Sequence, residues 1–227
     1  MDILNFISWI KGGKYSPTIP TDAVTVVGVP NPTRGDAYLP VTVPVTAIGA
    51  LFPFPPFPTS NTNIGKLLGG GIVVAEWDEN GVKKALVASL TNLAGNIVWT
   101  VPAKQTTALF PLGQSLYDGF TNTNAIITQT GAPATTAYAA GLARLFAGGG
   151  FNDWYLPSMW ELNMCYDAAG IVNKVLGSTN GFTGYYYWSS SEAVSSQAYV
   201  KYFQIGVQQN FNKSGVNRVR AVRIHNL

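Results

Sequence analysis

Cysteine and histidine are almost missing from this 227-residue sequence, which contains only Cys165 and His225. A single cysteine excludes disulfide bonds within the chain, so the folded parts must be stabilised by packing. One cysteine and one histidine are also too few to form a Cys/His zinc site. We interpret Cys165 as a small buried residue of a helix and not as a reactive thiol.

Charged residues are scarce as well, at 11% of the chain against about a quarter in typical soluble domains. The acids are scattered except for Glu76, Asp78 and Glu79, which we interpret as a solvated turn. Hard cations need several clustered oxygen ligands, so we expect no metal and no cofactor. Residues 198–227 hold five basic residues and no acid. We interpret them as strand residues that pair with acids elsewhere, because a nucleic-acid footprint would be larger.

Long apolar runs are also absent, since none approaches the roughly 20 residues that span a bilayer. Residues 1–14 make a poor signal peptide, because Asp2 precedes the apolar part and a small-residue cleavage site is lacking. We therefore expect no membrane insertion, and assembly in a cytoplasm.

Motifs of common enzymes are missing too. The sequence has no Gly-x-x-x-x-Gly-Lys phosphate loop, and Ser189, Ser190 and Ser191 lack the Gly-x-Ser-x-Gly context of a nucleophile. We expect no catalytic residue, and the chain is predicted not to be an enzyme.

Three segments are expected along the chain. Residues 1–14 are predicted to form a docking helix, with an apolar stripe that either docks on another protein or lies on its own domain: Ile3, Phe6, Ile7 and Ile10. Residues 15–60 are rich in proline and are predicted to be an extended oligomerisation arm with short strands at 24–27 and 41–43. The alternating Phe and Pro of residues 52–58 favour a rod that either packs in an interface or connects domains. Residues 61–227 are predicted to be a display domain.

Within the display domain, the patterns predict strands at 72–76 and 82–88, joined by the strong hairpin signal Asn80-Gly81. Residues 104–135 are rich in Thr and Asn and are predicted to be loop with a possible short helix. Helices are expected over 137–147 and from Ser158 to about residue 169, where Ser158 and Glu161 form a capping box and Gly170 ends the helix. Later strands are expected at 185–189, 198–204, 207–212 and 218–225.

Four large apolar residues are expected in the core: Trp154, Leu156, Trp160 and Trp188. Glu161 and Glu192 lie within apolar motifs, where an unpaired charge would be costly. We predict that backbone amides, or one of Arg218, Arg220 and Arg223, satisfy each carboxylate.

Several motifs occur in a fixed order: Asp-Trp-x-Leu-Pro-Ser-x-x-Glu-Leu at 153–162, Tyr-Trp-Ser-Ser-Ser-Glu at 187–192 and Arg-Val-Arg-x-Val-Arg at 218–223. In this order they resemble the C-type-lectin-like family typified by the C-terminal domain of the Legionella collagen-like adhesin, over residues 65–227. The resemblance implies an α+β, C-type-lectin-like domain with two helices, small antiparallel sheets and long loops. The calcium motifs of C-type lectins are missing, and the related formylglycine-generating enzymes need a cysteine pair that this chain lacks.

The late strands mix aromatic and amide side chains, and alternation sends about half of them outward. They supply our candidate ligand-binding residues: Tyr185, Tyr186, Gln197, Tyr199, Lys201, Gln208, Asn210 and Asn212. The alternative is a polar sheet surface without a ligand.

Together these features predict a virion structural protein, such as a bacteriophage fibre, collar or head-decoration subunit. It would be a homotrimer, anchored by its N-terminus to capsid, collar or tail proteins, and would present its display domain to a host glycan or surface protein. The alternative is a bacterial surface protein or a ligand-binding protein diversified by a retroelement.

Overall fold

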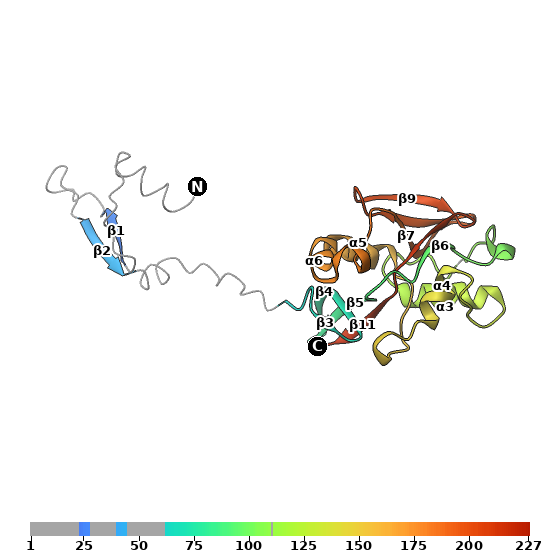
Figure 1. Cartoon of the computed structure of the whole chain (residues 1–227), viewed down its shortest axis with the longest axis horizontal. Coiled ribbons are helices and arrows are strands. Elements are labelled where there is room, and N and C mark those ends of the chain that lie inside the picture. The colour runs from blue at the N-terminus through green and yellow to red at the C-terminus, as the bar shows by residue number, and fades with distance from the viewer. Residues whose placement is uncertain (1–22, 28–39, 45–61, 110) are drawn as a thin grey trace. The chain divides into compact units, whose positions relative to one another are not determined.

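The computed structural model describes residues 23–27, 40–44, 62–109 and 111–227, and the chain forms two compact units, residues 1–61 and 62–227 (Figure 1). In the first unit, β1 (Ala23–Val27) pairs antiparallel with β2 (Pro40–Pro44), with Val24 opposite Val43. Both strands lie where the sequence predicts them. The predicted docking stripe of Ile3, Phe6, Ile7 and Ile10 and the Phe/Pro segment at 52–58 lie outside the described residues.

The second unit combines two sheets with α-helices, so the predicted mixed α+β class is confirmed. The first sheet has the strand order β11-β5-β4-β3. Its strands are β3 (Leu67–Leu68), β4 (Gly71–Glu79), β5 (Val82–Ala88) and β11 (Val222–Asn226). The predicted hairpin joins β4 to β5, and both turn residues have positive φ, 54° at Asn80 and 80° at Gly81. Asn and Gly tolerate this conformation best, which is why the dipeptide makes the turn.

The second sheet has the order β6-β10-β7-β8-β9. Its strands are β6 (Ala94–Val98), β7 (Tyr186–Val194), β8 (Gln197–Tyr202), β9 (Val207–Asn212) and β10 (Val216–Val219). Strand β10 is parallel to β7, and the other pairings are antiparallel. Strand β9 is an edge strand of this sheet, so its outer side has no strand neighbour within the described chain.

The prediction of a single strand over residues 218–225 is wrong. The chain instead leaves β10 in one sheet and enters β11 in the other, with Arg220 and Ala221 buried at the crossing. The Arg220 guanidinium donates to the carbonyl oxygens of Asn180 and Leu90 and to Asn92. These partners come from distant parts of the chain, which explains why alternation alone missed the break.

The helices are α3 (Gly119–Thr130), α4 (Ala139–Leu145), α5 (Met159–Asp167) and α6 (Ala169–Asn180), with short 3-10 turns at Pro102–Lys104 and Gly148–Gly150. Figure 1 shows α5 and α6 beside each other, away from α3 and α4. The possible short helix of residues 104–135 is the 12-residue α3, which Asp118 caps. The prediction that Gly170 ends the helical region is wrong, because the chain continues into α6 past it. The described residues of this unit therefore form four α-helices, where the resemblance implies two.

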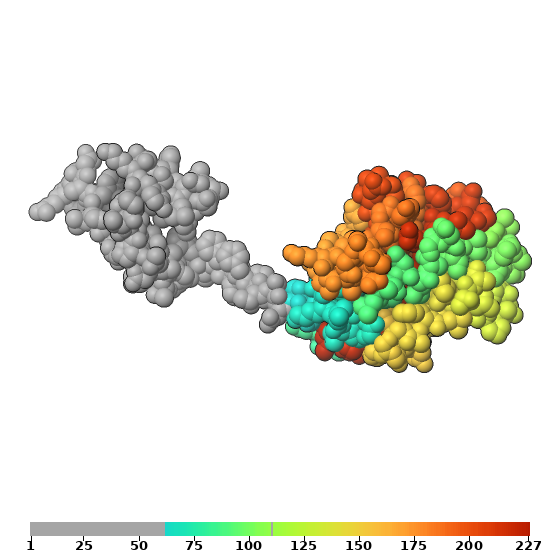
Figure 2. Space-filling model, viewed as in Figure 1, coloured from blue at the N-terminus to red at the C-terminus, as the bar shows by residue number. Residues whose placement is uncertain are grey.

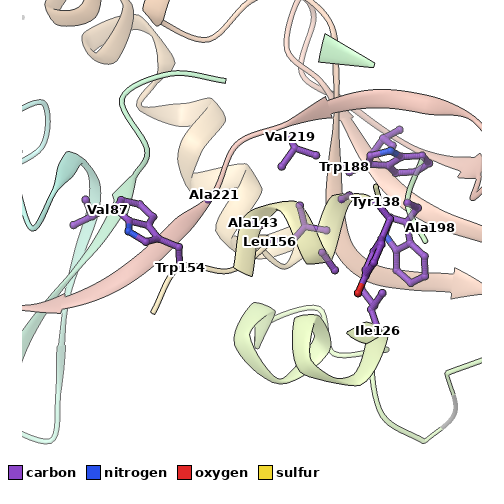
Figure 3. Packing of buried hydrophobic residues seen from close by; sticks show 14 of the residues in the cluster. Val87, Ile126, Tyr138, Ala143, Trp154, Leu156, Trp188, Ala198, Val219 and Ala221 are labelled. Carbon is purple, nitrogen blue, oxygen red and sulfur yellow. The ribbon is translucent and has the colours of Figure 1, made fainter. Parts of the chain in front are cut away.

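The core consists of two clusters of buried side chains. The first contains Trp154, Leu156 and Trp188, which all have 0% exposure, as the sequence predicts. Figure 3 shows Trp154 beside Val87 of β5 in this cluster. The second cluster lies under α5 and includes Leu162 and Cys165. Trp160 was also expected in the core, but it is 38% exposed, because it lies on the outer side of the first turn of α5.

Candidate functional site

Six of the eight candidate residues form three directly opposed pairs between β8 and β9. The pairs are Gln197 with Asn212, Tyr199 with Asn210, and Lys201 with Gln208. Opposed residues of antiparallel strands point to the same face, with Cβ atoms about 4.5–5.5 Å apart. The structure therefore gathers these six side chains on one face, which we call the β8–β9 face. The period-two pattern of the sequence predicts this grouping.

The β8–β9 face is a polar strip that solvent can reach. The three β9 residues Gln208, Asn210 and Asn212 are exposed, whereas their β8 partners are half-buried. Gln197 donates a hydrogen bond to Asn212 at 3.2 Å. Figure 2 shows the late strands, in orange and red, lying at the surface of this unit.

Lys201 is the cation of the β8–β9 face, and its ammonium lies 4.8 Å from the ring centroid of Tyr166 in α5. Burial against this helix lowers the pKa of Lys201, while the charge of Asp167 acts in the opposite direction. The polar end of Lys201 is thus held against Tyr166 at the α5 side of the strip.

Tyr186 and Tyr185 do not belong to these pairs. Tyr186 is opposite Tyr202, and their rings stack at 4.4 Å, with Phe211 at 4.8 Å from Tyr186. Since Phe211 alternates with Asn210 and Asn212 along β9, this aromatic stack lies on the other face of the sheet. Tyr185 precedes β7 and carries the Arg218 guanidinium 4.2 Å from its ring centroid. The structure therefore separates both tyrosines from the other six candidates.

Both ends of the β8–β9 hairpin are fixed. At the turn, Gly206 adopts a φ of 75°, and a Cβ there would come within 2.7 Å of the Tyr166 hydroxyl oxygen. At the open end, the Lys213 ammonium donates to the Ser195 carbonyl oxygen at 2.7 Å. A face held in this way loses little conformational freedom when it binds a ligand.

Lys213 belongs to a buried ionic centre that the sequence predicts only in part. Glu192 accepts hydrogen bonds from the Leu109 backbone N–H and from Gln114, so the expected backbone amide is present. Its cation is Lys213 and not an arginine. The ammonium also lies 4.7 Å from the Trp99 ring centroid. Burial lowers the pKa of Lys213, and the contact with Glu192 raises it.

Glu161 forms the predicted capping box with Ser158 at the start of α5. Its carboxylate accepts hydrogen bonds from the Ser158 backbone N–H at 2.7 Å and from the Tyr155 hydroxyl at 2.6 Å. Burial is the main cause that raises the pKa of Glu161, and the neighbouring charge of Asp118 raises it further. This carboxylate is committed to structure by its contacts.

Two arginines near the end of the chain are also structural, Arg220 between β10 and β11 and Arg223 within β11. Arg223 forms a two-point contact with Asp153, at 2.6 and 2.8 Å, which lowers the pKa of that carboxyl. Burial lowers the pKa of Arg220 to about 10. The interpretation that strand arginines pair with acids is right for Arg223, whereas the two terminal nitrogens of Arg220 donate to carbonyl and amide oxygens.

A shallow groove of about 390 Å³ lies elsewhere, between α3 and residues 108, 109 and 112, and sequence reasoning did not identify it. Its walls combine Leu109 and Leu112 with small or amide side chains such as Ala125, Asn124 and Gln129, which follow no recognisable motif. Over residues 62–109 and 111–227, no group of three or more His, Cys, Asp and Glu side chains is placed to hold a metal ion. None of the helices in these ranges combines the length and hydropathy needed to cross a bilayer.

Comparison with known proteins adds one finding to this geometry. A family model described as the Lcl C-terminal domain matches residues 88–223, which is more than half of the chain. The matched range includes the β8–β9 face, the Glu192–Lys213 pair and the three sequence motifs that carry the resemblance. No curated protein matches the chain.

Proposed function

The chain belongs to the Lcl C-terminal domain family, and from that premise we propose that residues 62–227 form a C-type-lectin-like display domain that binds a ligand on a cell surface. The mixed α+β architecture supports this proposal, as do the two small sheets and the long connection between β6 and α3. In this proposal the domain recognises its ligand and does not transform it, because its buried acids already have structural partners.

The observation that carries the proposal is the set of three opposed pairs on the β8–β9 face. Amide side chains both donate and accept hydrogen bonds, so Gln197, Asn210 and Asn212 suit hydroxyl or peptide groups. The Tyr199 ring offers an apolar surface with a polar end. We therefore propose a host glycan or a host surface protein as the ligand.

The test is the double variant Tyr199→Ala/Asn210→Ala, with binding to host cells and to a glycan array as the measurement. We expect at least a tenfold loss of binding, because about 1–1.5 kcal/mol is expected from each lost contact. The matched control is Gln209→Ala, which changes an exposed side chain of the same strand on the opposite face. If the double variant is folded and binds like the parent, the β8–β9 face is not the binding site.

We propose a virion as the setting, with the chain as a fibre, collar or head-decoration subunit of a bacteriophage. The apolar stripe of residues 3–10 and the proline-rich residues 15–60 support an anchoring and assembly role. Mass spectrometry of purified virions tests this, together with deletion of residues 1–13, which should abolish incorporation. If the protein is instead found on a bacterial surface, or its gene adjoins a reverse transcriptase with a template repeat, the alternative function applies.

A further inference from the structure

Three aromatic side chains from three elements meet on the surface of the second unit. The Trp160 ring centroid, in the first turn of α5, lies 6.3 Å from that of Trp77 in β4 and 6.1 Å from that of Tyr117 in the loop before α3. The ring planes are inclined by 70° and 60°, so the rings meet edge to face. We call Trp77, Tyr117 and Trp160 the aromatic trio.

Two rings of the aromatic trio are open to solvent, because Tyr117 is 68% exposed and Trp160 is 38% exposed, and the neighbouring Leu116 is 40% exposed. Trp77 is half-buried and packs against the second core cluster. Contiguous exposed apolar side chains mark interaction surfaces, and Trp and Tyr are the residues that most often dominate binding there.

The loop that carries Tyr117 is held in place. The Trp160 backbone N–H donates to the Leu116 carbonyl oxygen at 2.9 Å, and the Tyr117 and Asp118 N–H groups donate to Ser115 Oγ. The Ser115 carbonyl oxygen in turn accepts a hydrogen bond from Ser191 Oγ at 2.7 Å. Binding at the trio would therefore not need to order this loop first.

An exposed carboxylate adjoins the trio. Asp118 is exposed, follows Tyr117 directly and caps α3 by accepting from the Thr121 N–H. Glu161 follows Trp160 but is buried, and its carboxylate is bound to Ser158 and Tyr155. Aromatic faces are themselves negative, so rings and carboxylate together favour a cation.

Other aromatic rings of this unit already have such a cation. Arg144 lies 4.4 Å from the Phe120 ring centroid, Arg218 lies over Tyr185, and Lys201 over Tyr166. In the described part of the chain, no Arg or Lys lies over a ring of the trio. Lys84 is opposite Trp77 in the β4–β5 pair, but its ammonium forms an ion pair with Glu79 and does not lie over the Trp77 ring.

We propose that the aromatic trio and Asp118 form a docking site for an arginine side chain of a partner protein. The planar guanidinium stacks on an aromatic face, as Arg218 does on Tyr185, while Asp118 supplies the opposite charge. Arginine is favoured over lysine because its weaker hydration makes it easier to bring against a ring. This site is separate from the β8–β9 face and does not depend on the ligand proposed there.

The test is a titration of the full chain with the peptide acetyl-Gly-Arg-Gly-Arg-Gly-amide, followed through the tryptophan indole N–H signals by NMR. The matched probe is the same peptide with citrulline, which has nearly the shape of arginine but no charge. We expect the arginine peptide to shift the indole signals of Trp77 and Trp160, and the citrulline peptide to leave them unchanged. Added salt should weaken the binding.

Two variants locate the site. Tyr117→Ala should weaken binding of the arginine peptide about 2- to 5-fold, the range for an exposed cation–π contact. Asp118→Asn keeps a good helix cap but removes the charge, and should weaken binding about 3-fold at low salt. Tyr185→Ala is the control and should bind like the parent, because Arg218 already occupies that ring.

Three outcomes would overturn the proposal. If the citrulline peptide binds as tightly as the arginine peptide, the trio is an apolar surface that does not recognise the charge. Indole signals that do not move with either peptide would show that no such site exists. Unchanged affinity in both Tyr117→Ala and Asp118→Asn would place the peptide elsewhere.

Discussion

The Lys213 ammonium lies 2.5 Å from Glu192 Oε1, and neither side chain is exposed to solvent. The same ammonium donates to the carbonyl oxygens of Thr107 and Ser195, and Glu192 accepts the Leu109 backbone N–H. This pair therefore joins β7, the turn after β9 and the long loop before α3. Because burial removes both charges from water, the pair is stable only while these partners are all present.

Breaking the pair from one side should be severely destabilising. Lys213→Met leaves the Glu192 carboxylate buried without a cation, so we expect the free energy of unfolding to fall by about 3–5 kcal/mol. The double variant Lys213→Met/Glu192→Leu should recover much of this loss, since no buried charge remains. Urea denaturation followed by circular dichroism measures both. Equal losses in the single and double variants would contradict the coupling.

The contribution of Glu161 to stability should depend on pH. Burial raises the pKa of Glu161 above the value of about 4.3 in an unfolded chain, so the folded state holds its proton more tightly. The resulting stabilisation is complete below pH about 4.3 and is lost as the pH rises through the folded-state pKa. The parent should therefore lose stability relative to Glu161→Gln over this range. Urea midpoints of both proteins at several pH values test this, and a constant difference would refute it.

Removing the Glu161 carboxylate altogether should also be costly. Glu161→Ala leaves the Ser158 N–H and the Tyr155 hydroxyl without their acceptor inside the protein. We expect the free energy of unfolding to fall by about 1–3 kcal/mol. A denaturant midpoint within error of the parent would mean that other acceptors replace these hydrogen bonds, or that the bonds do not contribute to the free energy of unfolding.

The Cys165 thiol should be inert in the folded protein. It has 0% exposure, and burial raises its pKa, so little reactive thiolate forms at neutral pH. A thiol reagent such as dithionitrobenzoate should react fully in urea and not at all in native buffer within an hour. Rapid reaction without denaturant would show that α5 opens locally.

The first unit should mediate self-association, which we propose to be trimeric. The reason is that residues 15–60 alternate proline with Val, Thr and Phe and offer little periodic structure that could bury their apolar side chains. Light scattering should give a multiple of 24.3 kDa for the full chain, and a monomer for residues 62–227. A monomeric full chain at micromolar concentration would count against this assignment.

Features with a local cause could be predicted from the sequence. Asn80-Gly81 makes its turn because these residues tolerate positive φ, and Ser158 with Glu161 caps α5 through contacts three residues apart. The alternation along 197–212 placed six candidate residues on one face. The family resemblance likewise rested on motifs that are visible in the chain itself.

Features that depend on distant partners were decided by the tertiary structure. The Thr/Asn-rich α3 has weak helical propensity, and its packing against α4 and β7 adds stability that the local pattern does not show. The last strand divides at Arg220 because its guanidinium bonds to residues 90, 92 and 180. Lys213 meets Glu192, and Tyr117 meets Trp160, only because folding brings separate elements together. Local periodicity contains no information on such contacts, since they depend on how the chain packs as a whole.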